Sequence, residues 1–342
     1  MTASLVRWTL RPVGRLWQGF RGHRQSAQDA PQRVFDASTQ QRGRKMRFVT
    51  LALISLLLTS GCTVFGKLGY DNLPTLAMWK LNSYLSLTAA QRSVASRGFD
   101  DLLAWHRRTQ LDDYADLLRS IQKRVAAGTV TEADIQGWRE EVFARIDPIA
   151  VQAAPEIAEV ALTLSVQQIA SIRAEFADDN ETLRKQWMPV DREDRIKVRT
   201  KRYLERASFF LGNLTAEQKQ TARRMAAEAP ASEEVWFEQR LGRQQDLLSL
   251  LERMRAERMS KETAAPLIRD HLSRYRQLRE GPDRDGARSS LAAGDAMSAA
   301  MLAQATPKQR QHLNRLIQDW IDLAQELKTS PGTQAELSKT RP

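Results

Sequence analysis

The string Leu214-Thr215-Ala216-Glu217-Gln218 has the pattern of a helix start, in which a hydroxyl residue is followed three positions later by glutamine. The threonine side chain can accept a hydrogen bond from the backbone N–H three residues on, and the glutamine can reach back to the threonine N–H. The leucine before the threonine is typical of a hydrophobic staple. The string therefore predicts a capped helix that begins just after Thr215.

The same pattern recurs along the chain. Its other copies are Leu87-Thr88-Ala89-Ala90-Gln91, Val130-Thr131-Glu132-Ala133-Asp134, Leu164-Ser165-Val166-Gln167-Gln168 and Ala305-Thr306-Pro307-Lys308-Gln309, with Met259-Ser260-Lys261-Glu262-Thr263 as a degraded copy. The hydroxyl positions are separated by 43, 34, 50, 45 and 46 residues. Each interval can hold one long helix or a helical hairpin, but the intervals are too irregular for a strict solenoid repeat.

The sequence between these starts favours helix throughout. Residues 88–280 contain only five glycines and five prolines, and apolar residues recur at helical rather than alternating spacing. We therefore predict an all-α fold, a single domain of helical hairpins that is elongated or arched. The predicted helices are 75–86, 89–108, 110–127, 131–153 with a kink at Pro148, 156–163, 165–187, 191–211, 215–228, 232–257, 260–279, 289–303 and 306–328. Residues 281–286 are predicted to form a polar loop.

An export signal precedes this domain. Met46-Arg47 is followed by a mainly apolar stretch of eleven residues, 48–58, which as a helix rises about 16 Å, too little to cross a bilayer. The exit Leu58-Thr59-Ser60-Gly61-Cys62 resembles a bacterial lipobox, although Thr59 stands where lipoboxes prefer leucine. We expect 46–61 to be a lipoprotein signal peptide cut between Gly61 and Cys62, with Cys62 acylated. Thr63 after the cysteine implies the outer membrane in the enterobacterial sorting rule.

Most of the net charge of +11 precedes Cys62. Residues 1–61 hold ten basic and two acidic residues, which leaves 42 basic and 39 acidic residues, a net charge of +3, in the remainder. Nucleic acid is therefore not an expected partner. We interpret 1–45 as a wrongly assigned start or a basic extension, 62–73 as a lipidated tether, 74–328 as the periplasmic helical domain and 329–342 as a disordered tail.

No catalytic or metal-binding motif is present. The one cysteine excludes an internal disulfide and a multi-cysteine metal site. No two histidines after Cys62 lie three or four residues apart, and phosphate loops and nucleophile elbows are absent. We expect no cofactor and no enzyme activity, although a hydrolase site assembled across distant helices stays open. The tryptophans after Cys62 are expected to anchor the core.

Two charged clusters are candidate sites. Five arginines at 3-4-3-4 spacing make one stripe along a helix: Arg192, Arg195, Arg199, Arg202 and Arg206. An acidic cluster precedes it: Glu175, Asp178, Asp179 and Glu181. The two clusters can meet in a lattice of ion pairs if the chain folds back near Pro189. Alternatively, the stripe binds lipid A phosphates, anionic lipid or an acidic partner, and the carboxylates serve acid–base chemistry or a divalent ion.

Several strings resemble a family of uncharacterised proteobacterial lipoproteins with an all-helical domain of unknown function. They are Tyr70-Asp71-Asn72-Leu73, Leu87-Thr88-Ala89-Ala90-Gln91-Arg92, Leu103-Ala104-Trp105-His106-Arg107-Arg108, Leu164-Ser165, Asp178-Asp179-Asn180-Glu181 and Leu211-Gly212-Asn213-Leu214-Thr215. The resemblance is best over 70–225 and implies an exported, lipid-anchored helical protein without an established activity. The strings Thr88/Gln91 and Thr215/Gln218 are also similar to the Leu-Thr-x-x-Gln repeats of small periplasmic helical chaperones.

We therefore expect an outer-membrane lipoprotein, anchored at Cys62, whose periplasmic domain binds a protein, a peptide or another envelope component. The alternatives are a periplasmic chaperone and, from a different class, an envelope hydrolase.

Overall fold

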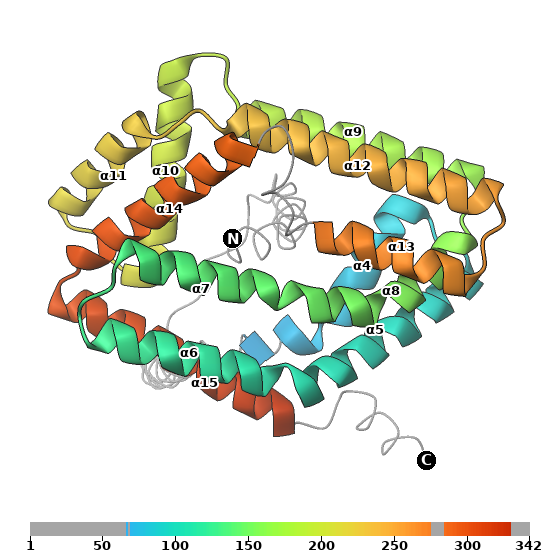
Figure 1. Ribbon diagram of the computed structural model, residues 1–342, viewed down its shortest axis with the longest axis horizontal. Coiled ribbons are helices and arrows are strands. Elements are labelled where there is room, and N and C mark those ends of the chain that lie inside the picture. Colours follow the sequence, from blue (N-terminus) through green and yellow to red (C-terminus); the bar gives the residue numbers. More distant parts are fainter. Residues whose placement is uncertain (1–65, 68, 275–283, 330–342) are drawn as a thin grey trace, which may run out of the picture. The chain divides into compact units, whose positions relative to one another are not determined.

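The computed structural model describes residues 66–67, 69–274 and 284–329, and within these ranges the protein is built from twelve helices without a strand. This confirms the predicted all-α class. All twelve helices lie in one compact unit that begins at Tyr70. In chain order (Figure 1) they are α4 (Leu73–Leu85), α5 (Ala89–Thr109), α6 (Leu111–Ala126), α7 (Glu132–Ala144), α8 (Ile146–Leu162), α9 (Val166–Trp187), α10 (Arg192–Leu211), α11 (Ala216–Glu228), α12 (Glu233–Ala256), α13 (Lys261–Ser273), α14 (Arg284–Ala303) and α15 (Pro307–Thr329).

The capping motifs begin helices as predicted. Reciprocal capping boxes precede α5, α7, α9 and α11, and at α15 Thr306 and Gln309 exchange bonds of 2.9 and 3.2 Å. The start of α7 shows that aspartate can replace glutamine at the last position of the motif, since Asp134 Oδ2 accepts from the Thr131 N–H at 2.7 Å. In the degraded copy the Thr263 N–H donates to the Ser260 hydroxyl at 3.4 Å, and the hydroxyl groups of the two residues are hydrogen-bonded at 3.3 Å.

The predicted helices 131–153 and 156–163 are wrong in their boundary. The break lies at Arg145, between α7 and α8, and α8 continues through Pro155. Pro148 causes no kink because it stands in the first turn of α8, where a backbone N–H has no helical partner. Pro155 deprives the Val151 carbonyl of its usual donor, but Val151 is 57% exposed, so water can hydrate that carbonyl.

Other boundaries also differ from the prediction. Gly69–Asp71 is helical and α4 begins at Leu73, within the segment predicted as a tether. The predicted loop 281–286 overlaps α14, which begins at Arg284. The predicted continuation of α13 to residue 279, and most of the predicted tail, lie outside the described residues. Trp79 is not a core anchor, because it is 51% exposed, whereas the other described tryptophans are half-buried.

Two hydrophobic cores hold these helices together. The first core gathers buried side chains of α4, α5, α8, α9, α12 and α13, and the second gathers those of α6, α10, α11, α14 and α15. Small residues set the packing of α8, which buries Ala150, Ala154, Ala158 and Ala161 on one side. Because alanines recur every third or fourth residue, α13 and α5 can approach α8 closely.

The packing order repeats between α4–α9 and α10–α15. The first half packs α4 on α9 and α5 on α8, and the second half packs α10 on α15 and α11 on α14. The halves also pack on each other, since α13 packs on α8 and α12 on α9, whereas α7 packs on α14 and α6 on α15. The capping motifs follow the same order, because they begin α5, α7 and α9 in the first half and α11, α13 and α15 in the second. The described part of the chain is thus built from two six-helix halves that exchange two helices each, α6 and α7 for α12 and α13.

Within the described residues, no single helix has the length and apolar composition to cross a membrane. Two segments, Glu132–Leu162 and Val166–Trp187, meet that test only when they are taken together, and they are bent by 119° with respect to each other.

Candidate functional site

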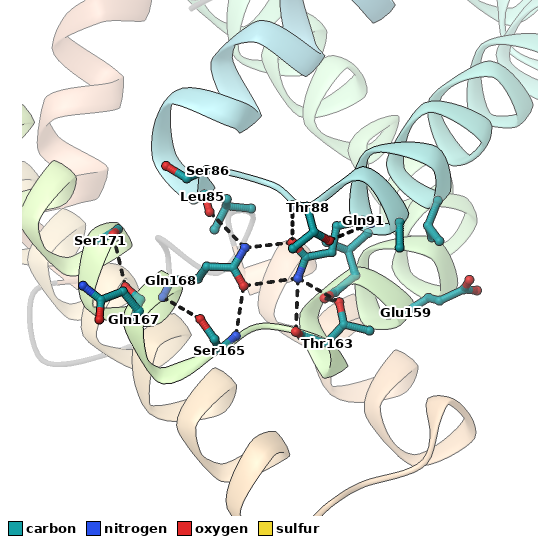
Figure 2. Close-up of a pocket in the computed structure, with 13 residues that line it drawn as sticks. Leu85, Ser86, Thr88, Gln91, Glu159, Thr163, Ser165, Gln167, Gln168 and Ser171 are labelled. Carbon is teal, nitrogen blue, oxygen red and sulfur yellow. Dashed lines mark hydrogen bonds between the residues drawn. The ribbon is translucent and has the colours of Figure 1, made fainter.

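A cavity of about 620 Å³ opens where the α4–α5 turn meets the α8–α9 turn (Figure 2). Its lining comes mainly from the first turns of α5 and α9 and the last turn of α8. At its base two glutamines of the capping motifs, Gln91 and Gln168, are buried side by side (Figure 2).

The two side-chain amides form a reciprocal pair. Gln168 Nε2 donates to Gln91 Oε1 at 2.7 Å, and Gln91 Nε2 donates to Gln168 Oε1 at 3.2 Å. Each amide also donates to a carbonyl at a helix end, Gln168 to Leu85 and Gln91 to Thr163. Each oxygen accepts in addition from the N–H of its own capping residue.

The second half of the chain contains the same kind of reciprocal glutamine pair, and we call each pair, with the helix ends that it joins, a joint. Gln218 and Gln309 exchange amide bonds of 3.0 and 2.9 Å, and they donate to the carbonyls of Gln304 and Asn213. In both joints the amide groups are satisfied by one another and by helix ends. We therefore interpret the glutamines, and the base of the cavity, as joints between helix starts rather than as groups free to bind a ligand.

The arginine stripe of α10 divides into two parts. Arg195 pairs with Glu234 of α12 and donates to the Val190 carbonyl at 3.2 Å. Arg199 is buried, and it forms a two-pronged pair with Glu233 at 2.8 Å. Its third nitrogen donates to the carbonyls at the end of α11, Ala226 at 3.0 Å and Ala229 at 2.7 Å. These two arginines join α10 to α11 and α12.

The next two arginines of the stripe form no such pairs. Arg202 and Arg206 stand one helical turn apart, both half-buried, and within the described part of the chain neither has a carboxylate partner. Positions four residues apart share one face of a helix, with Cβ atoms about 5–6 Å apart. The two guanidinium groups therefore emerge from the same face of α10.

An aromatic stack holds Arg202 in place. Its guanidinium carbon lies 3.9 Å from the ring centroid of Trp187, and Trp187 stacks on Trp236 with centroids 5.6 Å apart and planes 20° apart. Burial lowers the pKa of the Arg202 guanidinium, and the like charge of Arg206 lowers it further. Glu233 opposes this effect, but its oxygens are already bound to Arg199. Positive charge thus exceeds negative charge around Arg202.

The acidic cluster is dispersed along α9 rather than gathered. Asp179 accepts a hydrogen bond from the Tyr84 hydroxyl of α4, and Glu181 pairs with Lys185 on its own helix. Glu175 is half-buried and Asp178 is exposed. Arg195 and Arg199 pair with Glu234 and Glu233 of α12 instead, so the arginine stripe and the acidic cluster do not form a lattice of ion pairs. No group of three metal-ligating side chains occurs among the residues that the structure describes.

The remaining predicted site residues have simple positions. Arg192 is exposed in the first turn of α10. Gly61 and Cys62 lie outside the described residues. His106 is half-buried, and its Nδ1 lies 2.8 Å from the Tyr70 hydroxyl, an arrangement suited to fastening the chain before α4 onto α5.

Sequence reasoning missed two sets of functional side chains. The stack of Trp187 and Trp236 joins helices far apart in sequence, and no local pattern indicates it. The carboxylates of Glu233 and Glu234 had a signal, because two acidic residues begin a predicted helix. That signal explains their position at a helix N-terminus but not their choice of arginine partners.

Comparison with known proteins gives a family and no activity. No curated protein and no solved structure matches the chain. The model of DUF6279, a family of unknown function, matches residues 83–277, which is more than half of the chain and includes α5 to α13 complete. The chain therefore belongs to the DUF6279 family of unknown function.

Proposed function

We propose that this protein is a lipid-anchored, non-catalytic binding protein on the periplasmic face of the outer membrane, and that it binds phosphate groups of an envelope lipid at Arg202 and Arg206. The anchor follows from the lipobox-like string that ends at Cys62. The observation that carries the binding proposal is the pair of adjacent guanidinium groups without a carboxylate partner among the described residues.

The geometry favours an anion. Arg195 and Arg199 have partners that neutralise them, whereas Arg202 and Arg206 leave an excess of positive charge on one face of α10. The stack on Trp187 restricts Arg202 before any ligand arrives, so less side-chain entropy is lost on binding. A bound anion would also relieve the repulsion between the two arginines.

The arrangement suits phosphate better than carboxylate. Each guanidinium is a planar fork that can engage two oxygens at once. A carboxylate has two oxygens, enough for one fork, whereas a terminal phosphate has three non-bridging oxygens and carries up to two charges. Two forks one helical turn apart can therefore share one terminal phosphate, and this chemistry is common to lipid A and free phosphate, whereas the phosphodiester of a phospholipid offers two non-bridging oxygens and one charge.

Titration calorimetry in neutral detergent tests the proposal with the full-length protein. The probes are lipid A in mixed micelles, phosphatidylglycerol in mixed micelles, and inorganic phosphate. We expect Arg202→Gln together with Arg206→Gln to weaken lipid binding at least tenfold, because one charge-assisted hydrogen bond contributes about 1.5–3 kcal/mol. Binding of inorganic phosphate with equal affinity would identify a free anion rather than a lipid as the ligand.

The matched control removes two arginines elsewhere. Arg223 of α11 and Arg315 of α15 are exposed and form no ion pair within the described residues, so Arg223→Gln with Arg315→Gln removes the same charge. Equal loss of binding in both double variants would mean that overall charge, and not this face of α10, attracts the lipid. Unchanged binding in Arg202→Gln/Arg206→Gln, with lowered stability, would mean that these arginines serve the fold alone.

A further inference from the structure

Helix α4 presents an apolar strip to the solvent. Leu73 is 40% exposed and Trp79 is 51% exposed, and half-buried Leu76 lies between them. The three residues are spaced by three, so they are successive neighbours along one side of the helix. Trp79 is the most exposed tryptophan among the residues that the structure describes. A solvated indole of this size is unusual, because tryptophan is buried on average.

The strip belongs to a firmly held helix. The opposite side of α4 packs on the first core through Met78, Leu81 and Leu85. Tyr84 at its end donates to Asp179 of α9. Just before the helix, Asp71 pairs with Arg107 of α5 at 2.8 Å. Since contacts hold the helix at both ends, the exposed strip is a stable surface and not a frayed terminus.

The charge of α4 suits a membrane surface. The helix carries no acidic residue, and Lys80 is its one basic residue. The Lys80 ammonium lies 4.4 Å from the ring centroid of Tyr84. Placing this helix against a bilayer would therefore bury no carboxylate, and a lysine beside an apolar strip can extend its ammonium toward the head groups. Tryptophan favours the boundary between head groups and acyl chains.

The chain itself brings α4 to the bilayer. Leu73 stands eleven positions after Cys62, and eleven residues of extended chain span at most about 40 Å. The interfacial layer of a bilayer is about 5–7 Å deep on each side. With acyl chains on Cys62, α4 is thus the first long helix within reach of the lipid surface. Other exposed apolar residues, such as Val166, Val190 and Phe209, lie farther along the chain.

We infer that the strip of Leu73, Leu76 and Trp79 on α4 rests in the interfacial layer of the bilayer that holds the lipid anchor, and so orients the helical domain on the membrane. This inference rests on the acylation of Cys62 in the proposed function. It is independent of the arginines of α10, because the contact is apolar and requires no anionic lipid.

Tryptophan quenching in vesicles tests the contact. The mature protein, lipidated at Cys62, is reconstituted into phosphatidylcholine vesicles whose acyl chains are either normal or brominated near the glycerol. These vesicles carry no net charge and no terminal phosphate, so they lack the ligand proposed for the arginine face. We expect bromine to quench part of the emission of the wild type and Trp79→Phe to lose most of that quenching. The matched control, Trp138→Phe on α7, should retain the quenching of the wild type.

Two failures can be told apart by flotation of the same samples. Protein that floats with the vesicles but shows equal bromine quenching in wild type and Trp79→Phe would overturn the α4 contact and leave the anchor intact. Protein that does not float would overturn the anchor and the α4 contact together. Circular dichroism confirms folding of each variant, and Leu73→Ser provides a second variant that should reduce the quenching of Trp79 while retaining that residue.

Discussion

Replacement of Gln218 by leucine measures what an interlocked capping motif contributes to this fold. The side chain of Gln218 is fully buried, with 0% of its surface exposed. Leucine has a similar volume, so Gln218→Leu removes hydrogen bonds and leaves little cavity. In the wild type, the Gln218 amide both donates to and accepts from the Gln309 amide. It also accepts from the Thr215 N–H at 3.0 Å and donates to the Gln304 carbonyl at 3.3 Å.

The loss follows from which groups remain without a partner. The Gln309 amide retains bonds to the Thr306 N–H and the Asn213 carbonyl, so it stays partly satisfied. The Thr215 N–H loses its partner, and an unsatisfied buried group costs about 1–3 kcal/mol. The two amide–amide bonds contribute about 1 kcal/mol each. We therefore expect the free energy of unfolding to fall by about 3–5 kcal/mol, a large part of the about 5–15 kcal/mol typical of a domain.

Urea unfolding followed by circular dichroism measures this change. The control is Gln220→Leu, an exposed glutamine on the same helix, which should alter stability by less than about 0.5 kcal/mol. The double variant Gln218→Leu/Gln309→Leu should lose about 2 kcal/mol less than the sum of the single variants, because both single variants break the same two bonds. A loss below about 1 kcal/mol for Gln218→Leu, or strict additivity, would refute the interlocked joint.

Two further predictions concern helix packing and pH. Gly98→Ala should lower the free energy of unfolding by about 1 kcal/mol, because a Cβ there would lie 2.8 Å from the Glu156 Cβ of α8, and overpacking of about 2 kcal/mol outweighs the helix propensity of alanine. The control is Gly137→Ala, where no atom lies within 4 Å of the added Cβ, so this change should stabilise α7. Urea unfolding of both variants measures the two effects. Burial lowers the pKa values of His106 and His271 below the ordinary value of 6.5, with smaller effects from Arg107 and Arg274. The unfolded state therefore binds more protons than the folded state, and stability is lost as the pH falls below 6.5. The melting temperature should therefore drop between about pH 7.5 and pH 5.5, and His106→Gln with His271→Gln should flatten that dependence; an unchanged slope would count against the linkage.

Local chemistry made the helix starts predictable. A hydroxyl residue and a glutamine three positions later interact within one turn, so Thr88 with Gln91 and Thr215 with Gln218 act alike whatever surrounds them. The effect of proline was harder to predict, because it depends on where in a helix the proline stands. Pro148 was predicted to kink a helix, yet it stands in the first turn of α8, a position that the apolar pattern alone did not reveal.

The candidate site was only half predictable for the same reason. The spacing of the arginines on α10 follows from helix geometry, and it correctly places Arg202 and Arg206 on one face. Whether each arginine is neutralised depends on carboxylates that arrive from α12, more than twenty residues away in sequence. The exposure of Trp79 also depends on distant helices, since nothing in the local sequence distinguishes Trp79 from the half-buried tryptophans.

By itself, the sequence determined that the protein is helical, where most of its helices begin and which residues share a helical face, because these properties depend on contacts within a few residues. Only the tertiary structure decided that the capping glutamines pair across helices, that α6, α7, α12 and α13 cross between the two halves, and that three arginines of five remain without a carboxylate partner among the described residues. Those outcomes depend on which helix ends meet in space. Which helix ends lie next to one another depends on the sum of many packing contacts, and no short stretch of sequence determines it.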